Sequence, residues 1–192
     1  MNINTIKAAL LSLLITGTVF SLFTFLFVSL RVLSFSSPVL VGLSAFVVPA
    51  VAIGLYQFLN DRFPGNALEK YSLLTSNLLL GLCVALLFFG YQKWYTAITF
   101  FTLFALLFFI EYKNKLRFMY RFYRCYVLLL IPFYIVFAVL DSKGLVKFSE
   151  AETLKLKLGH IGIEGYFYFM AVLLFAVYFF EFFRHKPGKT NG

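Results

Sequence analysis

Charged residues are scarce in this chain of 192 residues. Asp, Glu, Lys and Arg together make up 13% of the sequence, whereas soluble domains carry about 25%. Hydrophobic residues make up 61%, and 21% of all residues are aromatic. This composition excludes an ordinary soluble protein, and we predict an integral membrane protein.

Cysteine and histidine are also rare, with two of each. Cys83 and Cys125 have no neighbouring ligands, which is typical of apolar packing rather than of a metal or redox pair. His160 and His185 are predicted to lie at opposite membrane faces. The chain contains no glycine-rich phosphate loop, Cys-x-x-Cys pair, His-Glu-x-x-His motif or nucleophile elbow. We therefore expect no metal and no cofactor.

Long apolar runs are the main feature that the sequence does contain. A helix needs roughly 17–25 apolar residues to cross a bilayer, and lipid excludes unpaired backbone, so each run should be a helix. The predicted fold is all-α, a single membrane domain over residues 1–192 with six transmembrane helices. The predicted spans are 8–30, 38–59, 71–92, 94–110, 125–140 and 165–183.

The connections and the prolines refine this prediction. The turn Arg31–Ser37 is short, so the first two spans should form an antiparallel hairpin, and the longest connection, 141–163, should be a polar loop. Pro49 and Pro132 fall inside spans, where each should kink its helix. Such kinks either open a cavity between helices or only bend them, and the sequence leaves both interpretations open.

Lysine and arginine are unevenly distributed between the two faces. With six spans both termini share one face, which carries eleven of these cations against six on the other. The positive-inside rule then places both termini in the cytoplasm, and we expect a bacterial inner membrane. The first span is too long for a signal peptide and is predicted to stay uncleaved. The net charge of +9 lies beside membrane ends, which indicates anionic lipid rather than nucleic acid as the partner.

Glu164 stands out among the few acids because it opens the sixth span. A carboxyl group inside a membrane is costly and is by default a candidate functional group. Among apolar rings such a group favours its protonated form and can act as a general acid. Asp141 closes the fifth span at the same face. The alternative is an interfacial Glu that reaches water and does no chemistry. Glu181 lies about 25 Å further along the helix, where it should reach the interface and pair with Arg184.

From Leu55 onward, the chain resembles the small integral-membrane lycopene cyclases of carotenoid pathways. The resemblance is carried by Trp94–Phe100, Leu130–Phe133, Leu158–Tyr166 and the pair Phe180-Glu181. It implies proton-initiated cyclisation of the ends of a linear polyene, without redox change. The aromatic rings would then bind the polyene and stabilise a carbocation. The substrate-binding candidates are Tyr166, Phe167, Tyr168, Tyr134, Phe137 and Tyr95.

The chain also departs from the pattern of that family. Gly162 stands in place of a proline, and Gly165 replaces the second acid of a pair. Leu40 and Val41 occupy the positions of another acid pair. The resemblance therefore implies that a second cyclase subunit, or a second copy of this chain, restores missing acids.

Two functional hypotheses remain open from the sequence. One is a carotenoid-pathway enzyme, an isomerase of the lycopene cyclase type, with Glu164 as the catalytic acid and Asp141 assisting. The other is a non-catalytic membrane subunit or carotenoid-binding scaffold that reuses the fold. A small transporter is less well supported, because the spans contain few polar residues to line a path.

Overall fold

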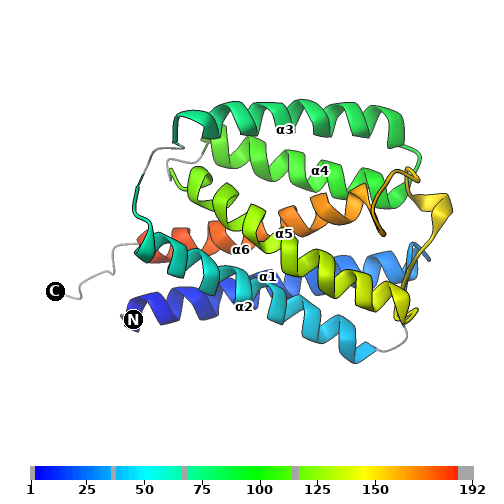
Figure 1. Ribbon diagram of the computed structural model, residues 1–192, viewed down its shortest axis with the longest axis horizontal. Coiled ribbons are helices and arrows are strands. Elements are labelled where there is room, and N and C mark those ends of the chain that lie inside the picture. The colour runs from blue at the N-terminus through cyan, green and yellow to red at the C-terminus, as the bar shows by residue number, and fades with distance from the viewer. Residues whose placement is uncertain (1–2, 36–37, 66–68, 114–116, 186–192) are drawn as a thin grey trace.

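The computed structural model describes residues 3–35, 38–65, 69–113 and 117–185. Long helices run side by side along this part of the chain (Figure 1). Their bounds are α1 Ile3–Ser29, α2 Pro38–Arg62, α3 Glu69–Gly90, α4 Trp94–Phe108, α5 Met119–Ser142 and α6 Ile163–His185, and α4 continues as a π-helical turn, η1, Phe109–Lys113. The structure is 83% helical, which confirms the predicted helical fold.

Within the described residues, five helices are long and apolar enough to cross a membrane: α1, α3, α4 with η1, α5 and α6. Helix α2 is 25 residues long but is not one of these five, so the count of six spans stays a prediction. The location of both termini in the cytoplasm also stays a prediction. Of the cations behind it, Lys115, Lys186 and Lys189 lie outside the described residues.

Helix α6 lies at the centre of the bundle, where it packs against α1, α2, α4 and α5. In its most apolar stretch 56% of the residues are buried, against 17% in α3 and in α5. The small residues Ala171 and Ala176 are fully buried and allow neighbouring helices to approach closely. Ser12 of α1 donates a hydrogen bond of 2.6 Å to the carbonyl of Ala176. Side chains on α6 therefore lie mainly among other helices rather than against lipid.

The two ends of the bundle differ. At one end, the terminal end, α1 begins and α6 ends (Figure 1). At the other, the capped end, strand β1 (Leu33–Phe35) pairs antiparallel with β2 (Val146–Phe148), and β3 (Lys157–Leu158) pairs with β4 (Ile161–Gly162). A short 3₁₀-helix, η2 (Glu150–Glu152), lies between β2 and β3.

The predicted turn 31–37 and the predicted polar loop 141–163 both contain strands that the sequence analysis did not anticipate. The turn after α1 and the loop after α5 are more than a hundred residues apart in sequence, yet they form one sheet. The pairing satisfies backbone groups that would otherwise need water. Local sequence signals could not reveal it, because each strand is only three residues long.

Candidate functional site

Glu164 lies in the first turn of α6, and its side chain is 0% exposed. Its Oε1 accepts a hydrogen bond of 2.9 Å from the Thr96 hydroxyl and one of 2.6 Å from the backbone N–H of Leu154. Its Oε2 is also buried and has no hydrogen-bond partner among the described residues. The carboxyl group is therefore held by neutral donors at one oxygen, while the other is unpaired. This geometry does not fit a carboxyl that reaches open water.

Two segments supply these donors. Thr96 belongs to the first turn of α4. Leu154 follows η2, and that segment is tied to the start of α4 by two contacts. The Trp94 N–H donates a 3.0 Å hydrogen bond to Glu152 Oε2, and the Lys93 ammonium donates to the Thr153 carbonyl. The loop and the helix start are thus fixed together around the Glu164 carboxyl.

Two glycines border the carboxyl group. A Cβ added at Gly162 would lie 3.2 Å from Glu164 Oε2, and one at Gly165 would lie 2.9 Å from Cγ2 of Ile161. Gly162 therefore leaves room beside the unpaired oxygen. At Gly165 the fold has little space for a side chain, so the second acid that the resemblance implies there is replaced by a residue that fits.

A polar cavity of about 250 Å³ reaches Glu164 at the capped end. Its polar lining residues are Asp141, Thr153, Lys155, Lys157, His160 and Glu164. A second, ring-lined cavity of about 220 Å³ lies between the helices, and its aromatic lining residues are Phe20, Phe27, Tyr95, Phe133, Phe137, Phe148, Tyr168 and Phe169. Tyr95, Phe137, Phe148 and Gly165 line both cavities. The two spaces therefore adjoin, with Glu164 beside the boundary.

The two prolines that were predicted to kink their helices lie next to the ring-lined cavity. Pro49 and Pro132 are inside α2 and α5, as predicted. Their neighbours Val48 and Phe133 both line the ring-lined cavity. The sequence left open whether the kinks open a cavity between helices or only bend them. The position of Val48 and Phe133 at the cavity wall agrees with the first interpretation.

Around the shared boundary, Phe27 packs edge to face with Tyr95 and with Tyr168, and the rings of Tyr95 and Tyr168 are tilted against each other. The Tyr95 ring lies 5.1 Å from Phe27 and 6.2 Å from Tyr168, centroid to centroid, and Phe27 lies 5.6 Å from Tyr168. A cation over such ring faces is stabilised by their negative electrostatic potential. The cavity therefore suits an apolar guest that develops positive charge.

The structure brings together some of the predicted site residues but not all. Asp141 is exposed and lines the polar cavity with Glu164, while Tyr95, Phe137 and Tyr168 line the ring-lined cavity.

The other candidates lie elsewhere. Tyr134 and Tyr166 border an open hollow of about 480 Å³ on the outside of α5, and Phe167 packs against the Phe100 ring at 5.1 Å. The α6 residues 166–168 are adjacent in sequence, but a helix turns successive side chains by about 100°. They therefore face different surroundings.

Sequence reasoning missed Thr96 and Leu154 as partners of Glu164. Thr96 lay within a stretch that carried the resemblance, and a hydroxyl in the first turn of an apolar span was a usable signal. The Leu154 contact comes from a backbone N–H, which any residue would supply, so no side-chain pattern could indicate it.

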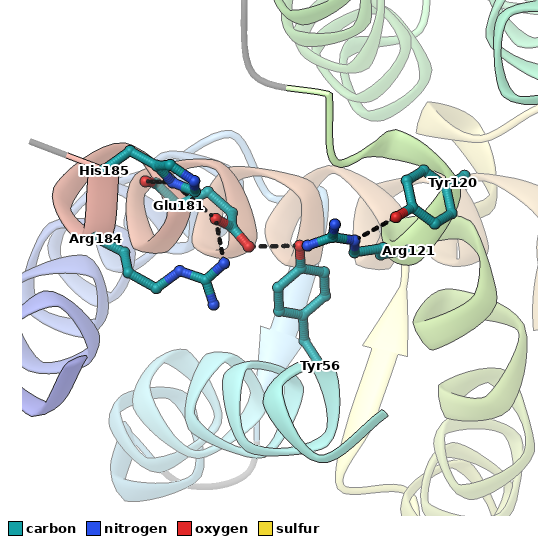
Figure 2. A network of polar contacts seen from close by, with 6 residues as sticks. All are labelled: Tyr56, Tyr120, Arg121, Glu181, Arg184 and His185. Carbon is teal, nitrogen blue, oxygen red and sulfur yellow. Dashed lines mark hydrogen bonds and ion pairs between the residues drawn. The ribbon is translucent and has the colours of Figure 1, made fainter. Parts of the chain in front are cut away.

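Glu181 occupies a different kind of site at the terminal end (Figure 2). It is 1% exposed, and its Oε1 accepts a 2.6 Å hydrogen bond from the Tyr56 hydroxyl of α2. Its Oε2 lies 3.1 Å from both Arg184 Nη2 and His185 Nδ1. The predicted pair with Arg184 is confirmed. The prediction that Glu181 reaches the interface is wrong, because α2 packs over it.

The remaining candidate ligands are dispersed. No group of three or more His, Cys, Asp or Glu side chains that could hold a metal ion occurs within residues 3–35, 38–65, 69–113 and 117–185. His160 and His185 lie at opposite ends of the bundle, as predicted. Cys83 and Cys125 are buried free thiols.

Comparison with known protein families gives a match over the second half of the chain. The family described as lycopene cyclase matches residues 92–183, just under half of the chain. This segment contains α4, α5, the connection from α5 to α6, and α6 up to Phe183, and therefore Glu164, Thr96 and Leu154. Comparisons with curated proteins and with solved structures give no match.

Proposed function

Because residues 92–183 are related to the lycopene cyclases, we propose that this membrane protein catalyses acid-initiated, non-redox cyclisation of the end of a linear polyene. The observation that supports this most directly is the state of Glu164. One carboxyl oxygen is held by two neutral donors, and the other is buried, unpaired and next to a ring-lined cavity. A carboxylic acid so placed has an oxygen free to carry and transfer a proton.

The reaction needs one proton and returns it. The Glu164 acid protonates the terminal double bond of the polyene, forming a C–H bond and leaving a tertiary cation. The neighbouring double bond attacks this cation and forms the ring C–C bond. Loss of a ring proton to the Glu164 carboxylate gives the cyclic alkene and restores the acid. Substrate and product are isomers.

The surroundings of Glu164 assist each stage. The rings of Tyr95, Phe137 and Tyr168 border the space where the cation forms and stabilise it through their faces. Burial of the carboxyl excludes the water that would otherwise capture the cation. Asp141 lies on the exposed side of the polar cavity and exchanges protons with the surrounding water.

Assembly belongs to the same proposal. An acid is absent at Gly165, where a side chain would contact Ile161, so a second cyclase subunit or a second copy of this chain supplies any further acid that the reaction needs. The membrane would be the inner membrane of a bacterium, where the polyene dissolves.

The test is expression in a bacterium that accumulates lycopene, alone and with a partner cyclase subunit. We expect cyclised pigment from the native chain and none from Glu164→Gln, while Asp141→Asn lowers the yield severalfold. Glu69→Gln is the matched control, because Glu69 pairs with Arg117 at the terminal end and should leave the yield unchanged. Lycopene that stays uncyclised in both settings would contradict the proposal.

A second candidate is a non-catalytic carotenoid-binding subunit. The missing acid at Gly165 favours it, because the resemblance implies a pair of acids there. In the same experiment it predicts that intact polyene, or a partner protein, copurifies with the chain without any conversion.

A further inference from the structure

One of the polar groups in the ring-lined cavity has no hydrogen-bond partner among the described residues and no role in the cyclisation of a hydrocarbon. The hydroxyl of Tyr168 is buried and makes no hydrogen bond of normal geometry within the described part of the chain. Tyr168 lines this cavity together with Thr24 of α1. A buried hydroxyl without a partner costs free energy, so its presence calls for an explanation.

The Tyr168 ring cannot turn away to satisfy its hydroxyl. It lies 5.7 Å from Phe20, 5.6 Å from Phe27 and 6.2 Å from Tyr95, centroid to centroid. These contacts come from α1 and α4, so the ring is held on two sides. The phenol oxygen is therefore fixed at the cavity wall.

Thr24 does not satisfy this hydroxyl well. It lies close enough to interact with Tyr168, but no hydrogen bond of normal length and angle joins the two side chains, and Thr24 donates its own hydrogen to the Phe20 carbonyl at 2.8 Å. The other hydroxyl groups in the lining belong to Ser44 and Tyr95, and neither makes a hydrogen bond to Tyr168.

The position of Tyr168 relative to Glu164 also matters. The two residues are four apart on α6, so they project from the same face of the helix, about 6 Å apart along its axis. The cavity boundary at Tyr95 and Gly165 lies between them. A guest whose reacting double bond meets Glu164 would therefore present its own end group to Tyr168.

We propose that the guest of the ring-lined cavity is an isoprenoid polyene whose end group carries one neutral oxygen, a hydroxyl or ketone, bound by the Tyr168 hydroxyl. The phenol donates to this oxygen, and a guest hydroxyl can also donate to the Thr24 oxygen. The polyene itself packs against the rings. This inference rests on the proposed function for the placement of the double bond and adds the class of end group.

The inference about the end group is tested by measuring the affinity of carotenoids that the protein binds but does not convert. The chain is purified in lipid nanodiscs and titrated with β-carotene and with zeaxanthin, which has the same skeleton plus one hydroxyl on each ring. Trp94 is the only tryptophan and precedes Tyr95 of the cavity boundary, so quenching of its fluorescence reports occupancy. We expect zeaxanthin to bind about tenfold more tightly, which is the effect of one buried hydrogen bond.

The variants separate the hydroxyl from the ring. Tyr168→Phe should bring the two affinities within about twofold of each other and leave that of β-carotene unchanged. Tyr178→Phe removes a phenol on the same helix that lines neither cavity and should keep the native preference. Equal affinities in the native chain, a preference that survives Tyr168→Phe, or no binding of either compound would overturn the inference. The pigment experiment with Glu164→Gln reports separately on the acid.

Discussion

The two ends of α6 each bury a glutamate, and the two sites have opposite character. At the terminal end, Glu181 forms an ion pair with Arg184, contacts His185 and accepts a hydrogen bond from Tyr56 (Figure 2). At the capped end, both donors to Glu164 in the described part of the chain are neutral, and both contact one oxygen. Glu181 lines neither cavity, whereas Glu164 lines the polar cavity and lies beside the ring-lined one.

This comparison separates a carboxyl that joins helices from one that is placed for chemistry. A buried charge must be paired to be tolerated, and Glu181 meets this condition with partners on α2 and α6. The partners of Glu164 within the described residues are a neutral hydroxyl and a backbone N–H. The same residue type thus serves stability at one end and, by our proposal, proton transfer at the other.

The largest stability effect should come from Glu181. Glu181→Gln removes the partner of Arg184 and His185 and should lower the free energy of unfolding by about 2 kcal/mol. Glu164→Gln keeps an oxygen that accepts from Thr96 and Leu154 and should change stability by less than about 0.5 kcal/mol. Denaturant unfolding in mixed micelles measures both. If Glu164→Gln destabilises the protein more than Glu181→Gln, the assignment of the structural role to Glu181 is wrong.

Thr96 tests how Glu164 is positioned. Thr96→Val keeps the shape of the side chain but removes the donor to Oε1, and cyclised pigment should form about tenfold more slowly. Thr96→Ser restores the hydroxyl and should recover most of the rate. If valine and serine give equal rates, the hydroxyl does not position the acid.

Tyr56 should contribute less than the ion pairs at the terminal end. Tyr56→Phe removes one hydrogen bond to Glu181 and should cost about 1 kcal/mol of unfolding free energy. A double-mutant cycle with Glu181→Gln should show coupling of similar size. Purely additive effects would mean that the hydrogen bond has no energetic role.

The smallest effect is expected at Gly162. Gly162→Ala places a methyl group 3.2 Å from Glu164 Oε2, which crowds the unpaired oxygen. The rate of pigment formation should fall about two- to threefold, with little change in stability. Gly81→Ala is the control, because a Cβ there meets no atom within 4 Å. A rate unchanged by Gly162→Ala would place the transferred proton elsewhere.

The candidate site was only partly visible in the sequence. Glu164 was identifiable because a carboxyl at the start of an apolar run is costly wherever the helix packs. Of the other candidates, Asp141, Tyr95 and Phe137 line the polar cavity with Glu164, and Tyr168 lines the adjoining ring-lined cavity.

Tyr134, Tyr166 and Phe167 were proposed for the same site, but they face other surroundings. Their direction depends on how α5 and α6 are rotated against their neighbours. Aromatic residues surround each of these helices on all sides, so the sequence pattern gives no preferred face.

The sequence by itself determined that this chain forms membrane helices, where most of them begin and end, and that acids are few. These properties follow from composition and from the backbone's need for hydrogen bonds in lipid, which act locally along the chain. Tertiary structure alone decided that α6 lies at the centre, that two distant connections form one sheet over its start, and that its two glutamates have different partners. Those outcomes depend on contacts between segments as much as 164 residues apart, as between Ser12 and Ala176, and no local pattern encodes them.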